Sequence, residues 1–210
     1  MRNPLHDVLE KPPVAFPGHR YLNNIFHEAL QQASQSLARL VDRKIGVDQY
    51  ALRVIRGESF FDCFENQLEQ SYFASIQKID EMFGSNVVLL VSEQDGSMLY
   101  RLLTGEHSNT NDGISKEMVN GIGELNNILG SAFINSLANF LQMTIHSTIP
   151  LNTFDMLGAI LQGIVLQDEY LNKQMLFAHA VIRDADTKSF TVRLIILSDW
   201  KRFGRILDRV

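Results

Sequence analysis

The chain has 210 residues, of which 45 % are hydrophobic, with a formal net charge of -5 and a single cysteine, Cys63. This composition fits one globular domain or two small ones with a sizeable core, and the acidic balance disfavours a nucleic-acid-binding protein. One cysteine excludes a disulfide framework and a cysteine-based metal site. No signal-peptide pattern opens the chain and no apolar run has membrane-spanning length, so we expect a cytoplasmic protein without membrane insertion.

The first half of the chain predicts an arm followed by one long helix and three strands. Three of the five prolines lie between residues 11 and 18, which indicates a flexible N-terminal arm over residues 1–19. Apolar residues then recur at helical spacing from Tyr21 to Asp42. The pattern next predicts three strands and a short helix that ends at Gly105, at residues 48–56, 67–79, 86–92 and 95–104.

The second half begins after a polar loop at residues 108–113, and Ser115 is the expected N-cap of its first helix. We expect a strand closed by Pro150, then a helix in preference to a strand, and then two strands joined by a hairpin loop. A closing helix capped by Asp199 follows. The first helix covers 116–142, the strand closed by Pro150 covers 144–149, and the next helix covers 154–165. The two hairpin strands cover 174–183 and 190–197, and the closing helix covers 199–208.

The two halves are alike in the order of their expected elements. Each has a long helix, a strand, a variable stretch, two strands and a short helix, and Val88–Glu93 resembles Leu194–Asp199. A repeat of half the chain length indicates a pseudo-two-fold domain and excludes a solenoid of short repeats. Chance alignment of two amphipathic helices is the alternative. We predict a single domain over residues 20–210, made of pseudo-repeats 20–107 and 113–210.

One face of the helix at residues 116–142 is unusually poor in charge. Asn120, Glu124, Asn127 and Ser131 share this face, and Glu124 is the only charged residue between Asn120 and Gln142. A solvated helix face usually carries several charged side chains. Three glycines lie in the same helix, at positions 121, 123 and 130, and glycine allows a close approach of another surface. The pattern predicts a face that docks a partner.

The spacing onward from this face carries a resemblance. Twenty-two residues separate Asn127 from Pro150, which gives Asn120-x3-Glu124-x2-Asn127-x22-Pro150. This pattern resembles the signature of the CheC family of response-regulator phosphatases, in which the first position is Asp or Ser. Gly123–Ala132 looks like the active helix of that family, and Val88–Gly105 is similar to the strand and helix that precede it. The similarity covers most of the chain from about Asn24 onward.

The resemblance implies an α+β fold in which two long exposed helices pack on a mainly antiparallel β-sheet. It also implies chemotaxis-type two-component signalling, with hydrolysis of the phosphoaspartate of a CheY-like receiver domain as the activity. In this activity Asn127 would place the attacking water, and Glu124 would dock a lysine of the receiver. The Mg²⁺ needed for phosphoryl transfer would belong to the receiver, so we expect no cofactor and no metal ligand in this chain.

A second, degenerate site is expected on the first long helix. Glu28 and Gln31, with Asn24 before them, have the spacing of Glu124, Asn127 and Asn120, and Val54 stands where the motif has proline. Glutamine keeps the amide but adds a methylene, so this site would be slow, silent or used only for docking.

Two rival functions remain. One is a non-catalytic CheC-like binding protein, either a CheD partner or a scaffold like the flagellar switch proteins. The other is a metal-dependent or small-molecule enzyme, which the sequence disfavours because it has no close histidine ligand pair and no phosphate-binding glycine loop.

Overall fold

The computed structural model describes residues 19–79, 84–105, 114–167 and 170–207. The predicted loop at residues 108–113, and the predicted N-terminal arm except for His19, lie outside the described residues. The described elements are α2 (His19–Val41), β1 (Ile45–Arg56), η1 (Gly57–Ser59), η2 (Phe61–Gln67), β2 (Ser71–Ile79), β3 (Ser85–Ser92), α3 (Glu93–Thr104), α4 (Lys116–Leu141), β4 (Leu151–Met156), α5 (Leu157–Gln167), β5 (Gln174–Asp184), β6 (Thr191–Asp199) and α6 (Trp200–Leu207).

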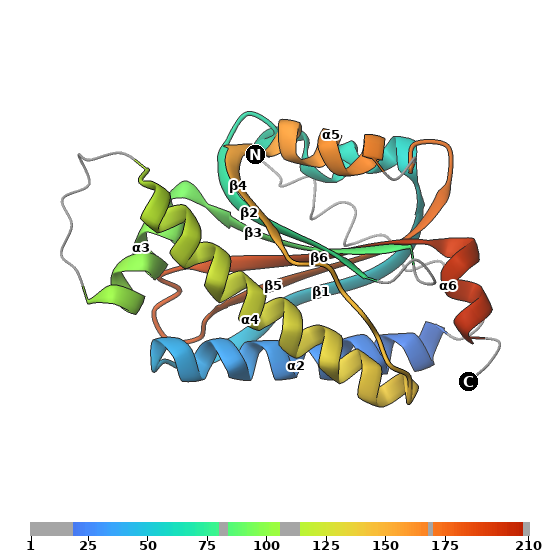
Figure 1. Ribbon diagram of the computed structural model, residues 1–210, viewed down its shortest axis with the longest axis horizontal. Helices are drawn as coiled ribbons and strands as arrows, with labels where there is room; N and C mark the ends of the chain where they lie inside the picture. The colour runs from blue at the N-terminus through green and yellow to red at the C-terminus, as the bar shows by residue number, and fades with distance from the viewer. Residues whose placement is uncertain (1–18, 80–83, 106–113, 168–169, 208–210) are drawn as a thin grey trace.

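In the described part of the chain, six strands form one sheet in the order β1-β5-β6-β3-β2-β4. All neighbouring strands are antiparallel. The two long helices, α2 and α4, lie side by side over one face of the sheet, whereas α5 lies over the opposite face (Figure 1). This arrangement confirms the predicted α+β fold, with two long helices packed on an antiparallel sheet.

The strand order has a pseudo-two-fold symmetry. Exchanging the halves of the chain replaces β1, β2 and β3 by β4, β5 and β6, and the order β1-β5-β6-β3-β2-β4 then reads the same from the other edge of the sheet. The edge strands β1 and β4 each follow a long helix, and the central strands β3 and β6 each precede a short one. The predicted repeat boundaries, 20–107 and 113–210, stay a prediction.

Each face of the sheet buries its own apolar cluster. Beneath the long helices, Phe26 of α2 meets Phe133 of α4 edge to face, with ring centroids 5.8 Å apart. On the opposite face Phe60, Phe64 and Phe177 pack together under α5. The central strands are therefore apolar on both sides, which explains the continuous runs of Val, Leu and Ile in β3 and β6.

The ends of several helices follow the predicted caps. Ser115 Oγ accepts the Met118 N–H at 3.1 Å at the start of α4, and Asp199 Oδ1 accepts the N–H groups of Lys201 and Arg202 at the start of α6. Gly105 closes α3 with a φ of 70°, a left-handed conformation that glycine adopts without a steric cost.

The predicted strand at residues 144–149 is wrong. This segment makes only an isolated bridge, between Ile79 and Ser147, and the strand β4 begins after Pro150 at Leu151. A side chain of β2 binds this segment instead. Gln77 Nε2 donates to Ser147 Oγ at 2.9 Å and to the Thr148 carbonyl at 3.2 Å. Because proline has no N–H, Pro150 stands before the ladder of β4 and does not close a strand.

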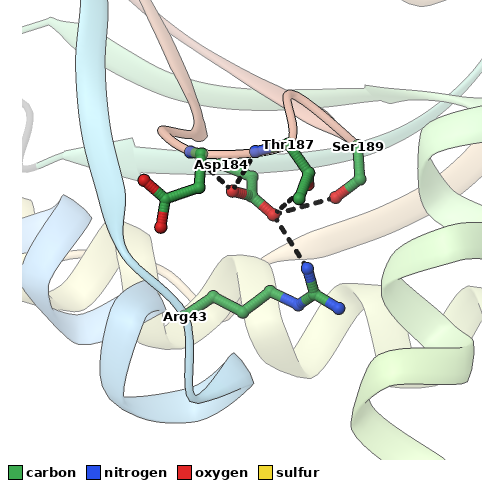
Figure 2. A network of polar contacts seen from close by, with 5 residues as sticks. Arg43, Asp184, Thr187 and Ser189 are labelled. Carbon is green, nitrogen blue, oxygen red and sulfur yellow. Dashed lines mark hydrogen bonds and ion pairs between the residues drawn. The ribbon is translucent and has the colours of Figure 1, made fainter.

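The turn between β5 and β6 is fixed by one carboxylate (Figure 2). Asp184 accepts hydrogen bonds from the Thr187 hydroxyl at 2.7 Å, from the Ser189 hydroxyl at 3.0 Å and from the backbone N–H of Thr187 at 3.1 Å. Arg43, which follows α2, lies 3.0 Å from the same carboxylate. The network therefore ties the α2–β1 connection to the β5–β6 hairpin, and it confirms the predicted turn after β5.

Candidate functional site

Glu124 and Asn127 both lie on the outer face of α4 with exposed side chains. The two positions between them point inward, and Ile122, Leu125 and Leu129 are buried against the sheet and α2. An i, i+3 pair on a helix places both side chains on the same surface patch, so the carboxylate and the amide can reach the same bound partner.

The amide of Asn127 has one neighbour along the helix. Ser131, one turn later, donates its hydroxyl to Asn127 Oδ1 at 3.4 Å. This long, weak hydrogen bond favours a rotamer in which the oxygen faces along α4 and the amide nitrogen stays free to donate. Asn120, the first residue of the motif, is exposed on the same helix one turn before Glu124.

The sequence suggests that the glycines of α4 allow a partner to approach closely. The structure shows a different role for them. A Cβ on Gly123 would meet the Asn152 amide of β4, one on Gly130 would lie 2.8 Å from Gln77 Oε1 of β2, and one on Gly121 would lie 3.0 Å from the Tyr100 ring of α3. Gly123 and Gly130 are buried. Glycine is needed because the protein's own elements pack closely against the inner side of α4.

The segment after Pro150 returns to the Glu124 turn of α4. Asn152 packs against Gly123, the residue before Glu124, so the strand that follows Pro150 lies beside the polar pair. Three apolar side chains are exposed in this region: Ile128 at 43 %, Ile149 at 93 % and Leu151 at 61 %. A polar pair with exposed apolar neighbours is typical of a surface that docks another protein.

The C-terminal ends of α2 and α4 show which residues of the two helices are equivalent. The Arg43 N–H donates to the Ala38 carbonyl after α2, and 100 residues later the Met143 N–H donates to the Ala138 carbonyl after α4. Asp42 and Gln142 are the left-handed residues at these ends, with φ of 50° and 51°. The buried positions repeat with the same shift of 100 residues along both helices.

This shift corrects the predicted pairing of the two helices, whereas a second site at Glu28 and Gln31 stays a prediction. The sequence comparison had paired Glu28 and Gln31 with Glu124 and Asn127, a shift of 96 residues. In the structure, Asn24 and His27 take the places of Glu124 and Asn127, while Glu28 and Gln31 take those of Ile128 and Ser131. The predicted pairing was wrong because a shift of four residues, about one helical turn, leaves polar residues on the same face of a helix.

No protein-family model matches the sequence, and no curated protein sequence is significantly similar to it. Solved structures are similar over nearly the whole chain. One is a CheC-like superfamily protein from Shewanella, 11 % identical with a TM-score of 0.55, covering 83 % of this chain and 97 % of that chain. The chain has the CheC-like fold.

Two further structures share this CheC-like fold. FliY from Thermotoga maritima is 12 % identical with a TM-score of 0.67, and the match covers 93 % of this chain and 96 % of that chain. CheX of the CheX–CheY–BeF3–Mg²⁺ complex from Borrelia burgdorferi is 13 % identical with a TM-score of 0.53, over 83 % of this chain and 97 % of that chain. FliM middle domains are similar as well.

On this CheC-like fold, the predicted residues lie on two neighbouring helices. Asn120, Glu124 and Asn127 lie on α4, whereas Asn24 and Glu28 are exposed on α2 and Gln31 is half-buried there. Val54, at the position expected for proline, lies inside β1 opposite Leu176. Among the described residues, no group of three or more His, Cys, Asp and Glu side chains could hold a metal ion, and no helix is both long and apolar enough to cross a membrane.

Sequence reasoning missed one polar residue of α4. Asn126 is 1 % exposed, and both polar atoms of its side chain lack a hydrogen-bond partner among the described residues. On the helical wheel Asn126 lies on the same side as the buried Leu125 and Leu129. This position is the signal that could have marked it as inward-facing.

Proposed function

We propose that this protein hydrolyses the phosphoaspartate of a CheY-like receiver domain, with the outer face of α4 as its docking surface. The observation that carries the proposal is the placement of Glu124 and Asn127, three residues apart and both exposed, beside the strand that follows Pro150. Support comes from the CheC-like fold and from the neighbouring CheX structure, whose crystals contain CheY and Mg²⁺.

Asn127 supplies the water-placing group. A carboxamide both donates and accepts hydrogen bonds, so it can hold a water molecule in line with the phosphorus atom and direct one lone pair at it. It does not remove the proton, because an amide is not basic at neutral pH. An acyl phosphate is already reactive, so placing the water accounts for most of the catalytic task.

Glu124 supplies the contact that sets the register of the two proteins. Its carboxylate pairs with a lysine of the receiver, and the ion pair gains strength when the interface excludes water. Ile128, one turn after Glu124, and Leu151 of β4 add exposed apolar surface. Mg²⁺ is a ligand of the receiver in this proposal, and this chain contributes none of its ligands.

The alternative is a non-catalytic binding protein on the same fold. FliM and FliY are among the structural neighbours, and one FliM structure is a complex with FliG. A scaffold of this kind, or a partner of CheD, would use an exposed helix face without needing the amide of Asn127. We favour the phosphatase because Glu124 and Asn127 have the residue types and spacing of the phosphatase motif. The cytoplasm, where two-component signalling operates, is the proposed compartment.

The deciding experiment follows phosphate release from a receiver domain charged with acetyl phosphate, with and without the protein. We expect Asn127→Ala to lower the rate on the order of 100-fold while receiver binding persists. Asn139→Ala is the matched control, because Asn139 is an exposed asparagine at the far end of α4. Equal rates for wild type and Asn127→Ala, with both folded and both binding, would leave the scaffold function as the correct one.

A further inference from the structure

The face of the sheet opposite α2 and α4 contains a polar cavity of about 290 Å³. It lies where the side chains on this face of the sheet change from apolar to polar. On this face β5 has Phe177, followed by His179, Val181 and Arg183. Its neighbour β6 has Thr191 and Arg193, followed by the apolar Ile195. The start of α3 contributes Asp95. The cavity is therefore on the other side of the sheet from the Glu124–Asn127 pair.

Several buried hydrogen-bonding groups at this cavity have no partner. His179 is 0 % exposed and neither of its ring nitrogens makes a hydrogen bond within the described chain; the same holds for Arg193 Nη1 and Arg183 Nε. Buried polar atoms in native proteins are nearly always paired, with protein, water or ligand. These four unpaired nitrogens belong to three residues that line one cavity, so their hydrogen-bond partners must come from water or a ligand inside it.

The chemistry of these nitrogens selects the occupant. Burial lowers the pKa of His179 to about 3, helped by the Arg193 charge, so the imidazole is neutral and offers one N–H donor and one acceptor. The guanidinium nitrogens are donors only. Three of the four unpaired nitrogens are thus donors, which calls for a ligand rich in acceptor oxygens.

Charge points the same way. Arg193 makes no ion pair with a described carboxylate, whereas Arg183 Nη2 lies 3.2 Å from Asp48. Asp95, the carboxylate that lines the cavity, accepts the Ser92 hydroxyl at 2.8 Å in the cap of α3. The Arg193 charge acts on Asp95 without forming an ion pair with it, and a guanidinium suits the oxygens of a carboxylate or a phosphate group.

We propose that this cavity binds a small organic anion, carrying a carboxylate or a phosphate group, through Arg183, Arg193 and His179. The volume is near the lower end of the range of roughly 300–1,000 Å³ that small-molecule sites have, so the ligand is a metabolite-sized molecule and not a peptide or a nucleic acid. This site is independent of the proposed phosphatase activity, since it uses the opposite face of the sheet.

The test is a ¹H–¹⁵N chemical-shift titration of the whole chain with inorganic phosphate and, separately, with citrate, at constant ionic strength set by sodium chloride. A melting-temperature assay alone would mislead, because phosphate stabilises proteins non-specifically through exclusion from their surface. We expect saturable shifts confined to the cavity, including the amides of Thr191 and Arg193. Saturation by phosphate alone would identify a phosphate group, and saturation by citrate alone would identify carboxylates.

Two variants sharpen the result. Arg193→Gln removes the charge but keeps an amide, and we expect it to weaken binding at least tenfold. Arg53→Gln is the matched control, because Arg53 is a buried arginine in β1 that does not line the cavity, and it should change the affinity less than twofold. Linear, non-saturating shifts with both probes, shifts centred elsewhere, or equal losses in the two variants would overturn the proposal. The wild-type titration decides this even where a variant fails to fold.

Discussion

Ser131 Oγ lies 3.4 Å from Asn127 Oδ1, one turn further along the exposed face of α4. The contact leaves the Asn127 nitrogen free, and it makes Ser131 a positioning residue for the amide that we propose to hold the attacking water. A hydrogen bond this long contributes little free energy, so the orientation of Asn127 depends mainly on its own rotamer and on the bound receiver.

Substitution of Ser131 should therefore have a small effect on turnover. We expect Ser131→Ala to lower kcat about two- to threefold, the loss of one weak hydrogen bond, compared with the loss on the order of 100-fold for Asn127→Ala. The melting temperature should not change, because Ser131 lies on the outer side of the helix. A loss as large as that of Asn127→Ala would mean that Ser131 touches the water or the phosphoryl group itself.

Charge reversal at Glu124 tests docking separately from chemistry. Glu124→Lys places a positive charge opposite the receiver lysine, so we expect KM to rise at least about tenfold, and the difference to shrink at high salt. Glu69→Lys is the control, since Glu69 is exposed and outside α4 and the change in net charge is the same. Equal effects of the two reversals would indicate a general field effect and argue against a specific pair.

The α2 face offers a test of the second site. Gln31 is half-buried and takes the place of Ser131. We therefore expect Gln31→Ala to leave the residual activity of an Asn127→Ala protein unchanged within about twofold. Single-turnover phosphate release measures this activity. The same assay with His27→Ala examines the residue that takes the place of Asn127. Disappearance of the residual activity in the Gln31 double variant would restore Glu28 and Gln31 as a working centre.

Gly130 should be intolerant of a side chain although it lies in a helix. A methyl group there would press on Gln77 Oε1 and disturb the two hydrogen bonds that Gln77 makes to Ser147 and Thr148, so Gly130→Ala should cost about 1–2 kcal/mol in chemical denaturation. Gly163→Ala in α5 is the control. Nothing lies within 4 Å of a Cβ at Gly163, and the substitution should stabilise the protein by up to about 1 kcal/mol. Stabilisation by both would show that Gln77 moves away freely.

The Asp184 network should make stability depend on pH. Hydrogen bonds, chiefly those from Thr187, hold the pKa of Asp184 far below its ordinary value. The carboxylate therefore stabilises the fold at neutral pH, and this contribution falls as the pH drops below the unfolded pKa of about 4 towards the lower folded value.

We expect Asp184→Asn to lower the melting temperature by several degrees at pH 7, and the difference from wild type to shrink steadily between about pH 4 and pH 2. Asp186→Asn, at an exposed position of the same turn, should change the melting temperature little at either pH. A difference that stayed constant with pH would mean that the Asn variant distorts the turn by its shape, without a contribution from the charge.

The sequence by itself determined the long helices, the central strands and the outer polar face. Apolar residues at helical spacing define α2 and α4, and unbroken apolar runs define β3 and β6, because local periodicity reports which side of an element is buried. The exposure of Glu124 and Asn127 followed from the same periodicity.

The tertiary structure alone decided which surfaces meet. The closeness of Gly130 to Gln77, the return of the chain after Pro150 to Gly123, and the shift of 100 residues between the helices depend on contacts between elements far apart in the sequence. The cavity at His179 and Arg193 is formed in the same way, by neighbouring strands that place isolated polar residues side by side. Local periodicity assigns a residue to a face, but only the packing of two elements determines its neighbours across that face.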